Sequence, residues 1–158
     1  MTDSPPEEEE RTGRRDLAAM IVPLGRALIA AEQPVLRAHR ISMWGYVVLN
    51  ALDREPLRTQ TALAQSIGAD KTRIIAVLDE LQRRGLIVRE HDPADRRARL
   101  LSLTAEGHRL RTSVQTAIQR REEHLLARLP MADRRGFLRA LDVLSSLPAE
   151  EITDPSDP

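Results

Sequence analysis

Three neighbouring side chains offer chemistry suited to the bases of nucleic acid. Thr72, Arg73 and Ala76 follow Asp70 and supply a hydroxyl, a guanidinium and a methyl group. On the first turn of a helix, these groups suit base edges and the thymine methyl group in a major groove, which is read by the N-terminal residues of a helix. Phosphate contacts are expected instead from Lys71, Thr61 and Arg83.

These groups require a helix that begins at Asp70, and the sequence predicts one. Asp70 is a good N-cap, Ile74, Leu78 and Leu81 form an apolar stripe, and Gly85 ends the pattern. A shorter helical segment, residues 59–67, ends at Gly68 just before this helix. Two helices joined by a tight turn that contains glycine predict a helix-turn-helix.

The acids in the second half of this helix limit how it could approach DNA. Asp79 and Glu80 lie beyond its first two turns, and phosphates would repel their carboxylates. We therefore expect only the N-terminal end of the helix to enter a groove.

After Gly85 the apolar period changes from that of a helix to that of a strand. Residues 86–89 and 98–103 predict two short strands with a turn at 92–97, and the segment 54–59 can add one or two strand residues. A hairpin directly after a helix-turn-helix predicts a winged helix. Arg96 and Arg99 could contact phosphate, although Arg99 could also lie along the strand. Asp95 is expected to hold the turn by hydrogen bonds and by pairing with a neighbouring arginine.

Long helices are predicted on both sides of the winged helix. Residues 16–32 have an apolar stripe after a possible N-cap at Asp16, and a break is expected at Gln33-Pro34. Ser42 is expected to cap a central helix over 43–53, and Thr104 to cap a helix that ends before Pro130. A last helix over 132–147 has its own leucine stripe. A second copy of the chain is the expected cover for these stripes, and the alternative is a monomer that folds the helices back.

The segment from Leu63 to Thr104 resembles the MarR family of bacterial transcription regulators. Two features carry the resemblance: the pattern LxxxGLIxR over residues 81–89, and a wing signature formed by Asp95, Arg97, Leu103 and Thr104. The flanking helices extend the resemblance to about residues 17–147. The resemblance implies an obligate homodimer with interlocked terminal helices, and it implies that Arg97 lies in or beside the minor groove.

The expected fold is therefore mainly α with a small β-hairpin wing. A winged helix over about 53–103 lies between dimerisation helices over about 16–32 and 104–147, within a domain over 16–148. Residues 1–15 and 149–158 are rich in acids, Pro and Ser and are expected to be disordered tails. Without the ten terminal residues at each end, the chain has 24 basic and 15 acidic side chains. The zero net charge of the whole chain therefore conceals a basic middle segment.

The expected function is that of a sequence-specific DNA-binding transcription regulator, a ligand-responsive repressor that binds a pseudo-palindromic operator as a homodimer. The resemblance implies a small amphipathic or phenolic anion as ligand. Trp44 could supply an aromatic wall, with His39 and Arg40 as cationic partners. A place for Trp44 in the core is the alternative.

Several other classes of function find little support in the sequence. There are no cysteines, which excludes disulfides and thiolate chemistry. Glycine-rich phosphate loops and nucleophile elbows are missing, so we expect neither an enzyme nor a cofactor. No pair of the four histidines has metal-site spacing, although a convergence of His39, His108 and Glu106 stays open. The alternatives are a protein-interaction module or antirepressor that does not bind DNA, and a metal-responsive regulator.

The sequence gives no sign of export or of membrane insertion. The N-terminal residues have no apolar core like that of a signal peptide, and no run of about 18 apolar residues occurs. We therefore expect a cytoplasmic protein without a membrane partner.

Overall fold

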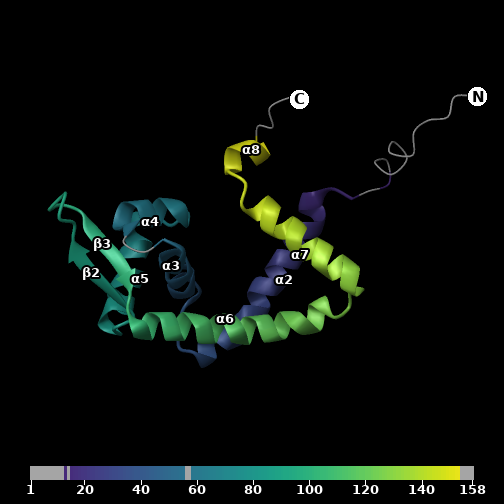
Figure 1. The fold of residues 1–158 in the computed structure, drawn as a ribbon, viewed down its shortest axis with the longest axis horizontal. Helices are drawn as coiled ribbons and strands as arrows, with labels where there is room; N and C mark the ends of the chain where they lie inside the picture. Colours follow the sequence, from purple (N-terminus) through teal and green to yellow (C-terminus); the bar gives the residue numbers. More distant parts are fainter. Residues whose placement is uncertain (1–12, 14, 56–57, 154–158) are drawn as a thin grey trace, which may run out of the picture. The chain divides into compact units, whose positions relative to one another are not determined.

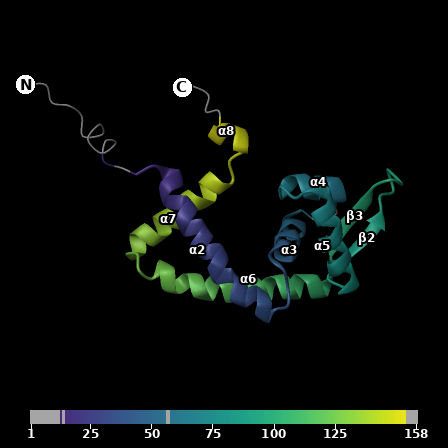
Figure 2. The same cartoon turned by 180° about the vertical axis from the view of Figure 1, so that it is seen from behind.

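A computed structural model describes residue 13 and residues 15–55 and 58–153, without the side chains of Arg58 and Lys71. The chain divides into two compact units, Met1–Val114 and Gln115–Pro158. Figures 1 and 2 show the ribbon from two opposite sides. The first unit contains α2 (Leu17–Ala38), α3 (Met43–Arg54), β1 (Arg58–Thr59), α4 (Gln60–Ser66), α5 (Lys71–Arg83), β2 (Ile87–His91), β3 (Arg99–Leu103) and the start of α6 (Ala105–Leu126). The second contains the rest of α6, α7 (Met131–Ser145) and α8 (Ala149–Thr153).

The sheet is small and antiparallel. Its strand order is β1-β3-β2, so the hairpin strand β3 lies between its partner and the two-residue strand β1. Leu101 at the centre of β3 is buried and pairs with Arg58 on one side and Arg89 on the other. This arrangement confirms the predicted hairpin and the short extra strand. The hairpin tip extends beyond the helices of this unit (Figures 1 and 2).

The core of the first unit lies among the helices and the hairpin. Every helix of this unit and both hairpin strands contribute at least one buried side chain. The most deeply buried are Leu36, Val48, Leu49, Leu52, Leu63, Ile74, Leu78, Leu81, Ile87, Leu101 and Val114. The predicted stripe of α5 is therefore the face that packs against α3 and β2.

Most of the predicted helix boundaries are confirmed by their capping bonds. The side chains of Ser42, Asp70 and Thr104 accept hydrogen bonds from the backbone N–H groups of Gly45, Arg73 and Gly107. Gly68 and Gly85 adopt positive φ angles of 64° and 69°, as a left-handed helix end requires. The N-cap role expected for Asp16 is wrong in part, because its side chain forms no capping hydrogen bond.

The break predicted at Gln33-Pro34 is also wrong. Helix α2 continues through Pro23 and Pro34 to Ala38. A proline in a helix removes one backbone hydrogen bond and crowds the preceding turn. Here Val35 and Leu36, directly after Pro34, are buried and α2 packs against α3, and this packing offsets the local cost.

The C-terminal tail is shorter than predicted. Helix α8 begins at Ala149, so the expectation of disorder over 149–158 is wrong for residues 149–153. Glu150 and Glu151 lie in its first turn, where acidic side chains interact favourably with the helix dipole. Residues 154–158, and residues 1–12 and 14 of the predicted N-terminal tail, lie outside the described residues.

Helix α2 is long and apolar enough to cross a membrane, judged by length and composition only. The sequence does not predict this, because Arg26, Pro23 and Gly25 interrupt the apolar run. Leu17, Met20, Ile21, Val22, Leu24 and Ile29 are exposed in the structure. An apolar helix surface of this kind needs a cover, either lipid or protein.

A glycine lies where α6 begins against the wing. Thr104 donates through its backbone N–H to the Leu86 carbonyl and through its hydroxyl to the Gly85 carbonyl. A Cβ at Gly107 would lie 2.1 Å from the Leu86 carbonyl oxygen. The backbones of α6 and of the wing therefore approach one another more closely than any other residue at position 107 allows.

We expect Gly107→Ala to destabilise the protein by about 1–3 kcal/mol, because the methyl group would force two backbone segments apart. Thermal unfolding followed by circular dichroism measures this effect. Gly136→Ala in α7 is the matched control, since a Cβ there meets nothing within 4 Å of its own chain. It is expected to leave the unfolding midpoint unchanged or to raise it. Equal midpoints for Gly107→Ala and the unaltered protein would contradict the close approach.

Candidate nucleic-acid interface

The first turn of α5 presents polar side chains on the face opposite its buried stripe. Asp70 accepts a hydrogen bond of 2.8 Å from the Arg73 N–H and so sets where the helix begins. Thr72, Arg73 and Ala76 are exposed, as is Arg83 in the last turn. Lys71 begins the helix, but its side chain lies outside the described part of the structure. Thr61 is exposed in the first turn of α4.

Arg73 contacts an aromatic ring on a neighbouring helix. Its guanidinium carbon lies 5.3 Å from the centre of the Trp44 ring, a distance typical of a cation–π interaction. Arg73 Nε also lies 3.6 Å from the Asp70 carboxylate. The sequence predicts base reading for Arg73, and either a ligand wall or a place in the core for Trp44. The structure brings the two residues together.

The wing tip is shaped by its aspartates. Asp95 accepts a hydrogen bond of 2.9 Å from the Arg97 N–H, and Asp92 accepts one of 2.8 Å from the Ala94 N–H. The Ala98 N–H donates to the Asp95 carbonyl and closes the turn. These bonds confirm that Asp95 holds the turn. Its expected pairing with an arginine is not found, because Asp95 forms no salt bridge within the described residues.

The arginines around this turn are all open to solvent. Arg96 and Arg97 are exposed at the tip, and Arg99 is exposed at the start of β3 opposite His91. The exposed first turn of α5 and the exposed wing tip belong to the same compact unit. A winged helix can use these two surfaces to enter adjacent grooves of a duplex.

The acids of α5 are paired with arginines, and these pairs were not among the sequence-based expectations. Asp79 lies 2.6 Å from the Arg89 guanidinium on β2, and Glu80 lies 3.5 Å from Arg84. The predicted repulsion from phosphates is therefore reduced by a cation beside each acid. Glu80 and Arg84 are four residues apart, a spacing that could have been read from the sequence. Asp79 and Arg89 lie on different elements, and no local pattern links them.

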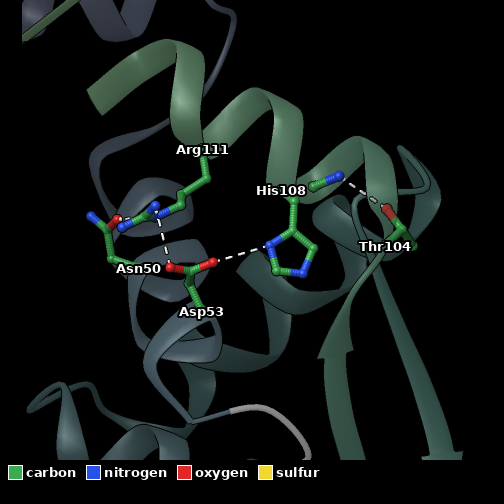
Figure 3. Close-up of polar contacts among 6 residues, drawn as sticks. Asn50, Asp53, Thr104, His108 and Arg111 are labelled. Carbon is green, nitrogen blue, oxygen red and sulfur yellow. Dashed lines mark hydrogen bonds and ion pairs between the residues drawn. The ribbon is translucent and has the colours of Figure 1, made fainter. Parts of the chain in front are cut away.

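A second polar cluster joins α3 to α6 (Figure 3). The Asp53 carboxylate accepts a hydrogen bond of 3.0 Å from His108 Nδ1 and lies 3.2 Å from the Arg111 guanidinium. Arg111 also donates to the Asn50 side-chain oxygen at 3.1 Å. The partners are three residues apart on each helix, so each pair occupies one helix face. The cluster ties the winged helix to the start of α6.

The predicted ligand residues have separate structural partners. His39 Nδ1 donates to the Val35 carbonyl at 2.8 Å, and its Nε2 lies 3.1 Å from the Ser113 hydroxyl, from which it accepts. Arg40 has a φ of 53°, and its carbonyl accepts a hydrogen bond of 2.6 Å from Arg84. Trp44 is half-buried against Arg73. His39 thus contacts α6, whereas Trp44 contacts α5.

The convergence of His39, His108 and Glu106 considered from the sequence does not occur. His39 contacts Ser113, His108 contacts Asp53, and Glu106 pairs with Arg109 at 2.6 Å. Across residues 13, 15–55 and 58–153, no three histidine, aspartate or glutamate side chains gather where they could hold a metal ion.

Sequence comparison places the winged helix among known regulators. The sequence model of the MarR family matches residues 46–98. A putative transcriptional regulatory protein for the hcr operon of Thauera aromatica is 34% identical over 96 residues, which are 61% of this chain and 58% of that protein, so the match spans less than two thirds of this relative. The transcriptional regulator HosA of Escherichia coli O111:H- is 33% identical over 94 residues, 60% of this chain and 70% of HosA.

Structural comparison extends the similarity to most of the chain. The PcaV regulator of Streptomyces coelicolor, solved in complex with its natural ligand, has 31% identity and a TM-score of 0.61 over 84% of this chain and 96% of PcaV. The transcriptional repressor CouR, solved bound to a 23-mer DNA duplex, has 25% identity and a TM-score of 0.70 over 92% of this chain and 99% of CouR. The similarity therefore includes the flanking helices as well as the winged helix.

Proposed function

Because the chain belongs to the MarR family of transcription regulators, we propose that it is a cytoplasmic, ligand-responsive repressor that binds a specific DNA sequence as a homodimer. One observation carries this proposal: the first turn of α5 and the wing tip both expose arginines. Arg73, Thr72 and Ala76 would read bases in the major groove, and Arg97 would lie in or beside the minor groove. Arg96, Arg99, Arg83, Lys71 and Thr61 would contact phosphate.

Exposed apolar faces outside the winged helix support the homodimer. Helix α2 exposes Leu17, Met20 and Ile21 in its first half. Helix α7 exposes a leucine-rich face with Phe137, Leu138, Leu141, Leu144 and Leu147. A monomer in water rarely leaves such faces uncovered, and a symmetric second copy offers matching surfaces. We propose this cover for α2 in place of a lipid bilayer.

Selection of bound fragments from a random-sequence duplex library tests the DNA-binding function. The recovered sequence is expected to be pseudo-palindromic, with half-sites about 10 base pairs apart, because a dimer presents two recognition helices one helical turn apart. Affinity is expected to fall steeply with added salt as arginines release counterions from phosphate. A protein-interaction module or antirepressor would enrich no sequence and would bind no duplex even at low salt.

The proposed ligand is a small phenolic or amphipathic anion. Trp44 supports it, because its ring is half-buried and already stacks with the Arg73 guanidinium on α5. A ligand that stacks on Trp44 would displace Arg73 or move with it. Bound ligand would thereby change how α5 presents its first turn. DNA affinity would fall by the ratio of the ligand's affinities for the free and the DNA-bound protein.

We expect a small phenolic carboxylate to quench the fluorescence of Trp44, the only tryptophan in the sequence, and to weaken DNA binding. Titration of a panel of hydroxybenzoates with the selected duplex present and absent measures both effects. Arg40→Ala is expected to weaken ligand binding about tenfold through the loss of a charge-assisted contact to the anion. Arg120→Ala, at an exposed position on α6, is the matched control. Ligand binding without any change in DNA affinity would contradict the proposed response.

A further inference from the structure

One ion pair connects α5, the helix whose first turn is proposed to read bases, to the wing. Arg89 lies on β2, and its guanidinium is 2.6 Å from the Asp79 carboxylate on α5. The Arg89 side chain is only 17% exposed, whereas that of Asp79 is 57% exposed. Glu80 of α5 and the N-cap Asp70 pair with arginines of their own chain segment, at spacings of four and three residues. Pairs within one segment do not constrain the angle between two elements. The Asp79–Arg89 pair joins α5 to β2 and can constrain it.

Arg89 occupies a position in the strand where an apolar residue would be expected. It follows the buried Ile87 by two residues, so both side chains lie on the inward face of β2. Its neighbour across the ladder is Leu101, which is fully buried. The Arg89 Nε is buried and has no hydrogen-bond partner. A guanidinium therefore occupies a core-facing position, and one of its nitrogen atoms has no hydrogen-bond partner there.

Such an arrangement stabilises a fold no more than an apolar residue would in its place. Removing a guanidinium from water is costly, and a partly buried ion pair seldom does better than an apolar residue of similar volume. A well-oriented charge-assisted hydrogen bond does, however, impose a direction and a distance on its two partners. The pair is therefore suited to orienting the wing rather than to strengthening the fold.

The geometry points to Asp79 and Arg89 as a positioning pair that sets the angle of the wing relative to α5; this rests on the proposed DNA binding. Arg89 lies two residues before β2 ends at His91, and the tip with Arg97 follows directly. When the first turn of α5 enters the major groove, the pair holds the tip where Arg97 reaches the adjacent groove. Neither Asp79 nor Arg89 needs to touch DNA for this.

A second role of the pair is electrostatic, and it must be separated from positioning. Without Arg89, the Asp79 carboxylate would face phosphates unpaired and would weaken binding by repulsion alone. Electrostatics alone predicts that Asp79→Asn tightens binding and that the double variant Asp79→Asn/Arg89→Met binds as the unaltered protein does. Positioning predicts that both variants lose the contribution of Arg97. The methionine keeps an apolar stem in the inward position.

The test measures the factor by which Arg97→Ala weakens binding to a duplex selected by the unaltered protein. This factor is expected to be about tenfold or more in the unaltered protein. In the Asp79→Asn and Asp79→Asn/Arg89→Met backgrounds it is expected to fall below about threefold. The control is Glu106→Gln/Arg109→Met, an equally short pair within one helix, in which the factor should stay the same. Unfolding midpoints confirm that each variant is folded. Asp79→Asn leaves the mostly buried Arg89 guanidinium without its carboxylate, and the double variant removes both groups.

The proposal is overturned if Arg97→Ala costs the same factor in every background, or if the double variant regains the affinity of the unaltered protein. These outcomes differ from failure of the proposed function, in which the unaltered protein selects no duplex at all.

Discussion

Leu141→Glu is expected to convert the homodimer to monomers and to remove specific DNA binding. Leu141 lies in the middle of the apolar face of α7 and is 46% exposed in the single chain. In a symmetric interface the substitution would bury two unpaired carboxylates, one from each copy, and burial of an unpaired charge is strongly unfavourable. The dimer dissociation constant should rise at least about a hundredfold.

Loss of the dimer should weaken operator binding by about 10² to 10⁴, because the second half-site would no longer be held at a high effective concentration. Sedimentation velocity measures the oligomeric state, and a gel shift with the selected duplex measures binding. Val143→Glu adds the same charge at a position of α7 that is 60% exposed and lies roughly 200° around the helix from Leu141, and it should leave both unchanged. A folded Leu141→Glu protein that is still dimeric at micromolar concentration would show that α7 is not part of the interface.

The double variant Arg73→Ala/Arg97→Ala is expected to have the second largest effect. Arg73 lies at the first turn of α5 and Arg97 at the wing tip, and both are exposed. Each arginine contact to DNA is worth about 1–3 kcal/mol, so two independent contacts should together lower affinity by about 10² to 10⁴. Arg73→Ala alone should also relax the preference for one base position of the selected sequence.

Competition with selected and scrambled duplexes measures affinity and specificity together. Arg109→Ala is the matched control, because Arg109 is an exposed arginine of α6 that pairs with Glu106 within its own helix. It should change affinity by less than about twofold. If the double variant bound the selected duplex as tightly as the unaltered protein, neither residue would contact DNA.

The order of the helices and strands could be predicted largely from near neighbours in the sequence. Asp70 and Ser42 define helix starts through bonds to residues three positions away, and Gly85 ends α5 with a positive φ. These features act over one turn, so their signal lies in a short window. The break at Pro34 was predicted wrongly because the burial of Val35 and Leu36 against other elements outweighs the local preference of proline.

The candidate site was predictable in part. The exposure of Thr72, Arg73 and Ala76 follows from the helical period and the apolar stripe, and the structure confirms it. The hydrogen bond from the Arg97 N–H to Asp95 likewise follows from the preference of aspartate for turns. The stacking of Arg73 on Trp44 could not be predicted, because it depends on how α3 and α5 pack.

By itself, the sequence determined the winged helix, its caps, its turn and the exposed arginines, since each depends on residues within a few positions of one another. Only the tertiary structure decided which charges pair. Asp79 contacts Arg89, and Asp53 contacts His108 and Arg111, across elements that the sequence separates. The physical reason is that a charge interacts with the charges that packing brings near it, whatever their distance along the chain.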